Sequence, residues 1–157
     1  MKTLSGIFIV IGVIVIVMFS IFWNQYSDSI PPEPEGKPVV LNPEDLAPGF
    51  IKETKKEWYA WHRKGLDLTK EERYEEALYC YNRAIKAWPE KVKQENQRIK
   101  HRPEATDTYL QKAYLYLKMR KPKLALIYFE KFESYFPGNK YAIQGKKQAK
   151  EMLSKEN

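Results

Sequence analysis

Residues 58–89 read WYAWHRKGLDLTKEERYEEALYCYNRAIKAWP, and this stretch decides the fold. Trp61, Gly65 and Leu68 recur at spacings of four and three, so they share one face of a helix. The second half places large rings and small residues on one helical face, at Tyr74, Ala77, Tyr81, Ala84, Ile85 and Trp88. Because small residues let two helices approach closely, the stretch predicts a pair of interdigitating helices.

The residues between these two helices predict a turn. Thr69 is followed three residues later by Glu72, a pattern typical of a capping box at the start of a helix. Pro89 ends the second helix, because proline has no amide hydrogen for the next backbone bond. Residues 58–89 are therefore expected to form a helical hairpin.

This hairpin resembles the tetratricopeptide repeat, whose signature is W-x2-L-G-x2-Y followed by A-x3-F, A and P. Lys64 replaces the usual leucine, and Leu68 replaces the usual tyrosine. Trp61 and Gly65 match the first part, and Ala77, Tyr81, Ala84 and Pro89 take the second part with its spacing intact. The resemblance implies an all-α array of helix pairs, in which the first helix of each pair lines a concave binding face.

A second copy of the signature follows at Tyr109, Ala113, Tyr116, Ala125, Phe129, Phe132 and Pro137. Ala125 follows Ala77 by 48 residues. Because the usual period is about 34 residues, an insertion of about 14 residues near 92–105 explains the excess. Phe132 replaces a small residue, so the second helix pair is expected to pack slightly wider.

The repeats set the expected organisation of an all-α domain over residues 50–157. It comprises repeat 1 (58–91), an inserted charged arm (92–105), repeat 2 (106–139) and a capping helix (140–154). Asn139 is expected to cap the last helix, because its side chain accepts hydrogen bonds from the first amides of a helix.

The charge of the chain is unevenly distributed. The net charge is +7 over 157 residues. Residues 24–49 carry five acids and one base, whereas 25 Lys and Arg stand against 15 Asp and Glu from residue 50 onward. The predicted domain is therefore basic, which favours acidic partners or anionic lipid head groups. Cys80 is the only cysteine, so an intramolecular disulfide and a cysteine-rich metal site are excluded.

Residues 4–23 form an uninterrupted stretch without a charge. As a helix it would reach about 30 Å, the thickness of the hydrocarbon core of a bilayer. The alternative is a cleaved signal peptide, but the bulky exit FSIFWNQY does not suit a small-residue cleavage site. We therefore expect a transmembrane helix at 4–23. Lys2 precedes it, which keeps residues 1–3 in the cytoplasm and, in a bacterium, places the domain in the periplasm.

Residues 24–49 are expected to form an acidic linker. Six of the ten prolines fall there, and this composition favours extended chain over helix. The apolar run at 39–41 interrupts the linker and is expected either to dock on the domain or to remain part of the linker.

The sequence contains no catalytic constellation. His62 and His101 lie in different segments without a metal-binding spacing, and there is no glycine-rich phosphate loop and no G-x-S-x-G motif. We therefore expect a protein that is not an enzyme and has no cofactor, metal, nucleic-acid ligand or small-molecule substrate.

One candidate binding surface is the concave groove that the resemblance implies. Its expected lining comes from the first helix of each repeat, on the face next to the packed one: Tyr59, His62, Leu66, Leu110, Tyr114 and Leu117. An apolar, aromatic groove suits an extended or helical peptide. The alternative is a groove filled internally, by the C-terminal helix or by residues 39–50. The lining lacks the Lys and Asn set that clamps C-terminal carboxylates in part of the family, so that function is rejected.

A second candidate surface is basic, and its residues are Lys112, Lys118, Arg120, Lys121 and Lys123. No acid occurs between Gln111 and Phe129, and the inserted arm adds further bases. The surface is either an ordinary solvated face or a site for an acidic protein or anionic lipid.

These features together predict a non-enzymatic, membrane-tethered scaffold or adaptor that binds protein subunits of a membrane complex. One alternative is a targeting receptor similar to the mitochondrial presequence import receptor. A basic domain would repel the basic helices that such a receptor binds, so this alternative ranks second. Another alternative is a chaperone-like module that holds unfolded segments in the groove.

Overall fold

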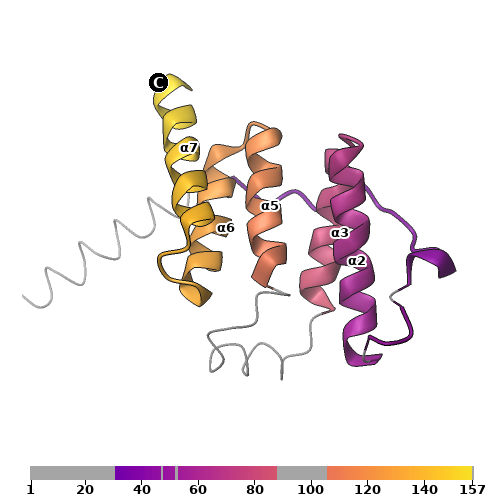
Figure 1. Ribbon diagram of the computed structural model, residues 1–157. Helices are drawn as coiled ribbons and strands as arrows, with labels where there is room; N and C mark the ends of the chain where they lie inside the picture. Colours follow the sequence, from indigo (N-terminus) through magenta and orange to yellow (C-terminus); the bar gives the residue numbers. More distant parts are fainter. Residues whose placement is uncertain (1–30, 47, 52, 88–105, 157) are drawn as a thin grey trace, which may run out of the picture. The chain divides into compact units, whose positions relative to one another are not determined.

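The computed structural model describes residues 31–46, 48–51, 53–87 and 106–156 (Figure 1). The chain divides into two units, Met1–Pro32 and Glu33–Asn157, and every element below belongs to the second. Within the described residues this unit contains helices and no β-strand, so the prediction of an all-α fold is confirmed for that part of the chain.

The helices follow one another as two hairpins and a final helix. Their order is η1 (Pro43–Asp45, a 3-10 helix), α2 (Glu53–Lys70), α3 (Tyr74–Lys86), α5 (Thr106–Lys118), α6 (Pro122–Tyr135) and α7 (Lys140–Glu156). α2 packs against α3, α5 against α6, and α6 against α7, while α3 also contacts α5 (Figure 1). The predicted arm at 92–105 lies outside the described residues.

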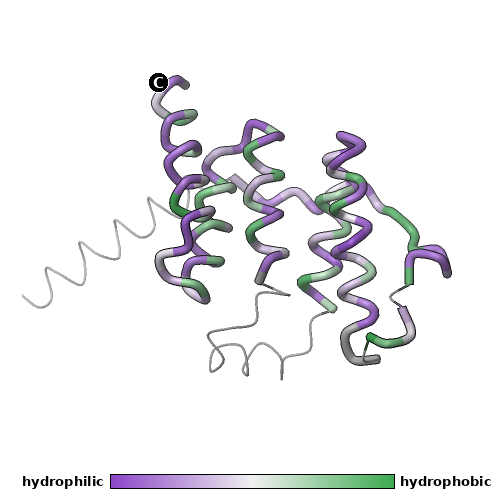
Figure 2. The backbone as a smooth tube through the Cα atoms, viewed as in Figure 1, coloured by the Kyte–Doolittle hydropathy of each residue, from purple (hydrophilic) through white to green (hydrophobic). Residues whose placement is uncertain are grey.

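The core follows the predicted pairing of large rings with small residues. A Cβ atom on Gly65 would lie 2.7 Å from Cε1 of Tyr81, whose side chain is fully buried, so the ring of α3 packs directly on this glycine of α2. Gly145 of α7 meets the ring of Phe129 in the same way. Hydrophobic and hydrophilic residues alternate along each helix, as expected where one face of each helix packs (Figure 2).

Most of the residues that define the predicted repeats are buried: Trp61, Gly65, Ala77, Tyr81, Ala84, Ala113, Tyr116, Ala125 and Phe129. Tyr109 is half-buried and Pro137 is exposed, while Pro89 lies outside the described residues. The final helix begins as predicted, because Oδ1 of Asn139 accepts hydrogen bonds from the amides of Tyr141 (2.9 Å) and Ala142 (3.3 Å).

The turn between α2 and α3 differs from the prediction. Thr69 does not cap α3, because its hydroxyl donates to the carbonyl of Gly65, 2.7 Å away within α2. Glu72 instead adopts a left-handed conformation with φ of 61°, and the amide of Arg73 donates to the carbonyl of Leu68 at 3.0 Å. A backbone turn therefore takes the place of the predicted capping box.

The predicted localisation needs a correction. A membrane-spanning helix requires about 20 predominantly apolar residues. No helix in the described parts of the chain has the length and apolar character needed to cross a bilayer. The predicted transmembrane segment, residues 4–23, lies outside the described residues. We therefore withdraw the prediction of a single-pass membrane protein with a cytoplasmic N-terminus and a periplasmic domain.

Acid is expected to destabilise the fold through His62. Its side chain is only 6% exposed, its Nδ1 lies 2.9 Å from Oγ1 of Thr108, and burial lowers its pKa from 6.5 to about 4. The unfolded chain therefore takes up this proton first, so the stability that neutral His62 provides is complete above pH 6.5 and is lost as the pH falls toward 4. The loss should be about 2–3 kcal/mol. Urea unfolding at pH 7 and pH 4.5 measures it, and His62→Gln should remove most of this pH dependence.

Candidate binding site at Lys112

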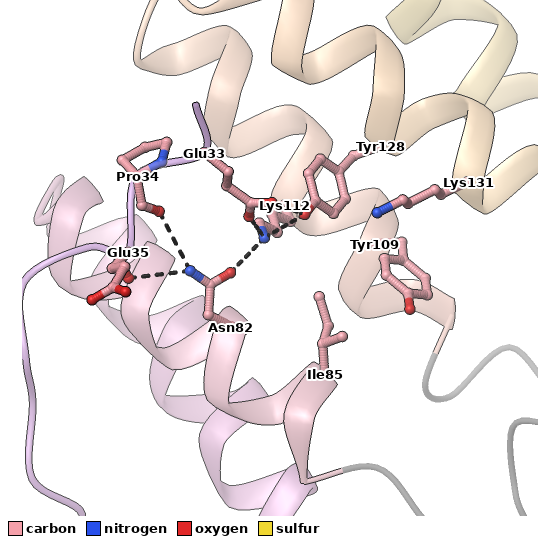
Figure 3. A pocket seen from close by; sticks show the side chains of 9 residues that line it. All are labelled: Glu33, Pro34, Glu35, Asn82, Ile85, Tyr109, Lys112, Tyr128 and Lys131. Atoms are coloured by element: carbon pink, nitrogen blue, oxygen red, sulfur yellow. Dashed lines mark hydrogen bonds and ion pairs between the residues drawn. The ribbon is translucent and has the colours of Figure 1, made fainter. Parts of the chain in front are cut away.

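The candidate site is built around a buried lysine on α5. The side chain of Lys112 is only 2% exposed. Its Nζ donates to the hydroxyl of Tyr128 at 2.8 Å, to Oδ1 of Asn82 and to Oε1 of Glu33 (Figure 3). A buried ammonium needs such partners, because an isolated charge is costly to remove from water.

Three helices position the groups around this ammonium. α3 contributes Asn82, α5 contributes Lys112 and Tyr116, and α6 contributes Tyr128. Nζ of Lys112 also lies 4.1 Å from the ring centroid of Tyr128 and 5.8 Å from that of Tyr116, where the ring faces attract a cation. We call Asn82, Lys112, Tyr116 and Tyr128 together the Lys112 site.

A carboxylate from the acidic linker occupies the Lys112 site. Besides the bond from Lys112, Glu33 accepts a hydrogen bond from the hydroxyl of Tyr128 at 2.5 Å and one from the hydroxyl of Tyr116 at 3.2 Å. A cation and two hydroxyls therefore converge on one carboxylate. Charge-assisted hydrogen bonds of this kind are stronger than neutral ones.

The backbone beyond Glu33 is held as extended chain against α3. Nδ2 of Asn82 donates to the carbonyl of Glu35 at 3.1 Å, and the amide of Lys37 donates to the carbonyl of Glu75 at 3.0 Å. Gly36 has φ of 87°, and a Cβ atom there would lie 2.5 Å from the amide nitrogen of Tyr79. No other residue fits this position without moving the helix backbone. We call residues 33–37 the docked segment.

Burial and pairing act in opposite directions on the two charged groups. Burial lowers the pKa of Lys112 to about 8, although the hydrogen bond and charge of Glu33 oppose this change. Burial alone would raise the pKa of Glu33, but the hydrogen bonds from Lys112 and Tyr128 and the charge of Lys112 together lower it. Both groups are therefore charged near neutral pH, and the ion pair forms.

A second acid of the linker pairs with a second lysine. Oδ1 of Asp45 in η1 lies 2.8 Å from Nζ of Lys64 on α2, and its other oxygen accepts a bond from the amide of Asn42 at 3.0 Å. Lys64 occupies the position of the signature leucine, and Lys112 follows it by the same 48 residues that separate Ala77 from Ala125. The linker thus meets lysines at equivalent places on α2 and α5.

Half of the predicted groove lining is buried within the helix array. His62, Leu110 and Leu117 are 6%, 7% and 6% exposed, respectively, whereas Tyr59, Leu66 and Tyr114 are half-buried. The hydroxyl of Tyr114 donates to the carbonyl of Tyr141 on α7 at 2.8 Å, and its ring packs edge-on against Phe129. The C-terminal helix therefore covers part of this surface.

The predicted basic surface requires one correction. Lys112 does not belong to it, because its ammonium is enclosed by α3, α5, α6 and Glu33. The remaining residues of that set, Lys118, Arg120, Lys121 and Lys123, are exposed at the end of α5 and the start of α6. We call these four the basic cluster.

Cys80 and the potential metal ligands are the other candidates for a reactive site in the described residues. Cys80 is fully buried, and burial raises the pKa of its thiol to about 12, so it remains protonated and unreactive. No group of three or more His, Cys, Asp or Glu in the described ranges is arranged to hold a metal ion.

No protein-family model, curated protein or solved structure matches the chain. The chemistry that the site itself offers is recognition of a carboxylate.

The docked segment should be released at alkaline pH. Glu33 raises the pKa of Lys112 relative to the same site without a carboxylate, so the docked state binds the proton more tightly. Docking is therefore strongest below the lower pKa that Lys112 has without the carboxylate, and it weakens as the pH rises from there through about 8, the pKa of Lys112 in the docked state. The carbon-13 shift of the Glu33 carboxyl group, followed from pH 7 to pH 9.5, should change with that midpoint. A shift that stays constant over this range would contradict the assignment of Lys112 as its partner.

Proposed function

We propose that the unit Glu33–Asn157 is a non-enzymatic adaptor of the tetratricopeptide type that binds extended segments of protein partners. The observation that carries this proposal is the docked segment, because the helix array already holds extended chain through main-chain hydrogen bonds and one carboxylate. In the recognition of extended chain, hydrogen bonds to the main chain provide affinity and side-chain sites provide specificity.

Internal repetition supports the assignment of the repeat type. Glu72 and Arg120 are 48 residues apart, and both adopt left-handed φ values, of 61° and 55°. The amide that follows each of them donates to a carbonyl five residues earlier, from Arg73 to Leu68 and from Lys121 to Tyr116. The two hairpins thus close with the same turn, and they place rings and small residues at the same offsets. Both features are expected of two copies of one structural unit.

The charge of the described surface favours partners that carry acidic residues. Both lysines at the equivalent positions are paired with acids of the linker. The basic cluster adds four exposed cations at the turn between α5 and α6. We therefore propose that the adaptor selects partner segments rich in Glu and Asp, with the basic cluster steering their approach.

Capture of partners from cells that express the protein tests this proposal. The full-length chain with a C-terminal affinity tag is cross-linked in the cells, and the retained proteins are identified. The proposal expects a reproducible set of proteins that bind the purified chain directly. If no captured protein binds the purified chain, the adaptor function is wrong.

Charge reversal of the basic cluster should slow association with such a partner. Exposed charges act mainly on the encounter, so Glu at all four positions should reduce the association rate by about tenfold at low salt and remove most of its salt dependence. Stopped-flow mixing at two salt concentrations measures both effects. The matched control reverses Lys147 and Lys150, which are exposed on α7. Equal effects of the two variants would contradict a steering role for the basic cluster.

A further inference from the structure

We propose that the Lys112 site recognises a partner segment of the pattern Glu-x-x-Gly, which takes the place of residues 33–37. This inference rests on the proposed adaptor function and names the class of its ligand: extended chain with one glutamate followed three residues later by glycine. In the structure Glu33 and Gly36 of the chain's own linker fill these two positions.

The glutamate is specified by groups that the folded helices supply. Lys112 has three donors, and among the described helices Asn82 and Tyr128 accept from two of them. The hydroxyls of Tyr116 and Tyr128 also donate to Glu33. A glutamine in this place would lack the charge, and its amide would bring donors toward a buried ammonium. The site therefore distinguishes a carboxylate from its neutral analogue.

The glycine is specified by close approach to α3. At the position of Gly36 a side chain would meet the amide nitrogen of Tyr79 and the carbonyl of Glu75, both of them backbone atoms that cannot swing aside. The next residue must keep its amide hydrogen, because the amide of Lys37 donates to Glu75. Proline is therefore excluded directly after the glycine.

Glu35, which lies between the glutamate and the glycine, is held through its main chain. Asn82 donates to the carbonyl of Glu35, whose side chain is exposed, so this contact carries no side-chain preference. An open cavity of about 360 Å³ beside the docked segment is lined by Ile85, Tyr109 and Lys131 (Figure 3). A partner has room there for larger side chains than those of the linker.

The docked segment is suited to exchange with such a partner. The side chain of Glu33 is 38% exposed, and the side chains of Glu35 and Lys37 are also exposed. Its attachment consists of one carboxylate, a few bonds to the main chain, and an exposed ion pair of Lys37 with Glu76 at 3.9 Å. Any chain with the same two residues can make these bonds, so the linker acts as a resident competitor for the site.

A peptide of residues 31–38, PPEPEGKP, tests the pattern on the full-length chain. Glu33→Gln in the protein removes the competing carboxylate, so the labelled peptide should bind this variant about tenfold more tightly than it binds wild type, measured by fluorescence anisotropy. In the peptide, Glu33→Gln and Gly36→Val should each weaken binding about tenfold or more. The matched control is Glu35→Gln in the peptide, which should leave affinity unchanged.

Two further protein variants, each with Glu33→Gln, attribute binding to the site. Adding Lys112→Gln should abolish peptide binding, and adding Tyr128→Phe, which removes only a hydroxyl, should weaken it. Helical content measured by circular dichroism identifies a variant that fails to fold. If Lys112→Gln fails to fold, weaker peptide binding by Tyr128→Phe is the result that attributes binding to the site.

The inference is overturned if the Glu33→Gln protein shows no binding, or if the Glu33→Gln peptide binds as well as the parent. It is also overturned if wild type forms a dimer that the peptide dissociates, because the occupant is then a second copy of this chain. If captured partners bind purified protein while the peptide does not, the adaptor function stands and only the pattern fails.

Discussion

Gly65→Leu is expected to lower the free energy of unfolding by about 3 kcal/mol or more, because overpacking a close helix contact forces the helices apart. Even a methyl group at this position would lie 2.7 Å from the ring of Tyr81. That ring is fully buried, and its hydroxyl is 3.2 Å from the hydroxyl of Thr69, so it has no free direction in which to move. Ala77→Trp should have an effect of similar size, because Ala77 is fully buried on the facing helix.

Urea unfolding followed by circular dichroism measures both changes. Gly49→Leu is the matched control, since a Cβ atom there meets nothing within 4 Å. It should change stability by less than about 0.5 kcal/mol. If Gly65→Leu and Ala77→Trp unfold at the same urea concentration as wild type, the pairing of α2 with α3 through these residues is wrong.

Glu33→Lys is expected to release the docked segment. The change places a second ammonium beside a buried one, where like charges repel most strongly. The amide of Lys37, which donates to Glu75, should then exchange its hydrogen at least about 30-fold faster, equivalent to about 2 kcal/mol of lost docking free energy.

Glu35→Lys provides the control for this experiment. It makes the same change in charge two residues away. The side chain of Glu35 is exposed, and this residue is held through its carbonyl. Exchange at Lys37 should be nearly unaffected by this variant. If the two substitutions accelerate exchange equally, the segment is held by the general charge of the domain and not by the Lys112 site.

The helical framework could be predicted from local sequence patterns. The spacing of Trp61, Gly65 and Ala77 requires helices whose small residues face large rings, and the structure buries all three. Asn139 caps α7 as its position before the last helical pattern indicates. The turn at Glu72 could not be predicted in this way, because a short polar sequence fits either a side-chain cap or a left-handed backbone turn.

The site could be predicted only in part, because it joins residues far apart in the chain. Lys64 departs from the repeat signature, and a partly buried lysine favours an acidic partner. Lys112 occupies the equivalent place, but an exposed basic run and a buried lysine look alike in sequence. Asn82 and Tyr128 carry no local signal, since their role follows from the packing of α3 and α6 around Lys112.

A double-mutant cycle between Glu33 and Lys112 tests the central claim most directly. Glu33→Gln, Lys112→Gln and the double variant are compared with wild type, and hydrogen exchange at the amide of Lys37 reports the docking free energy in each. If the carboxylate is held by this ammonium, the two substitutions should be coupled by about 1–3 kcal/mol. Strictly additive effects, or a Lys37 amide that is unprotected in wild type, would contradict the account.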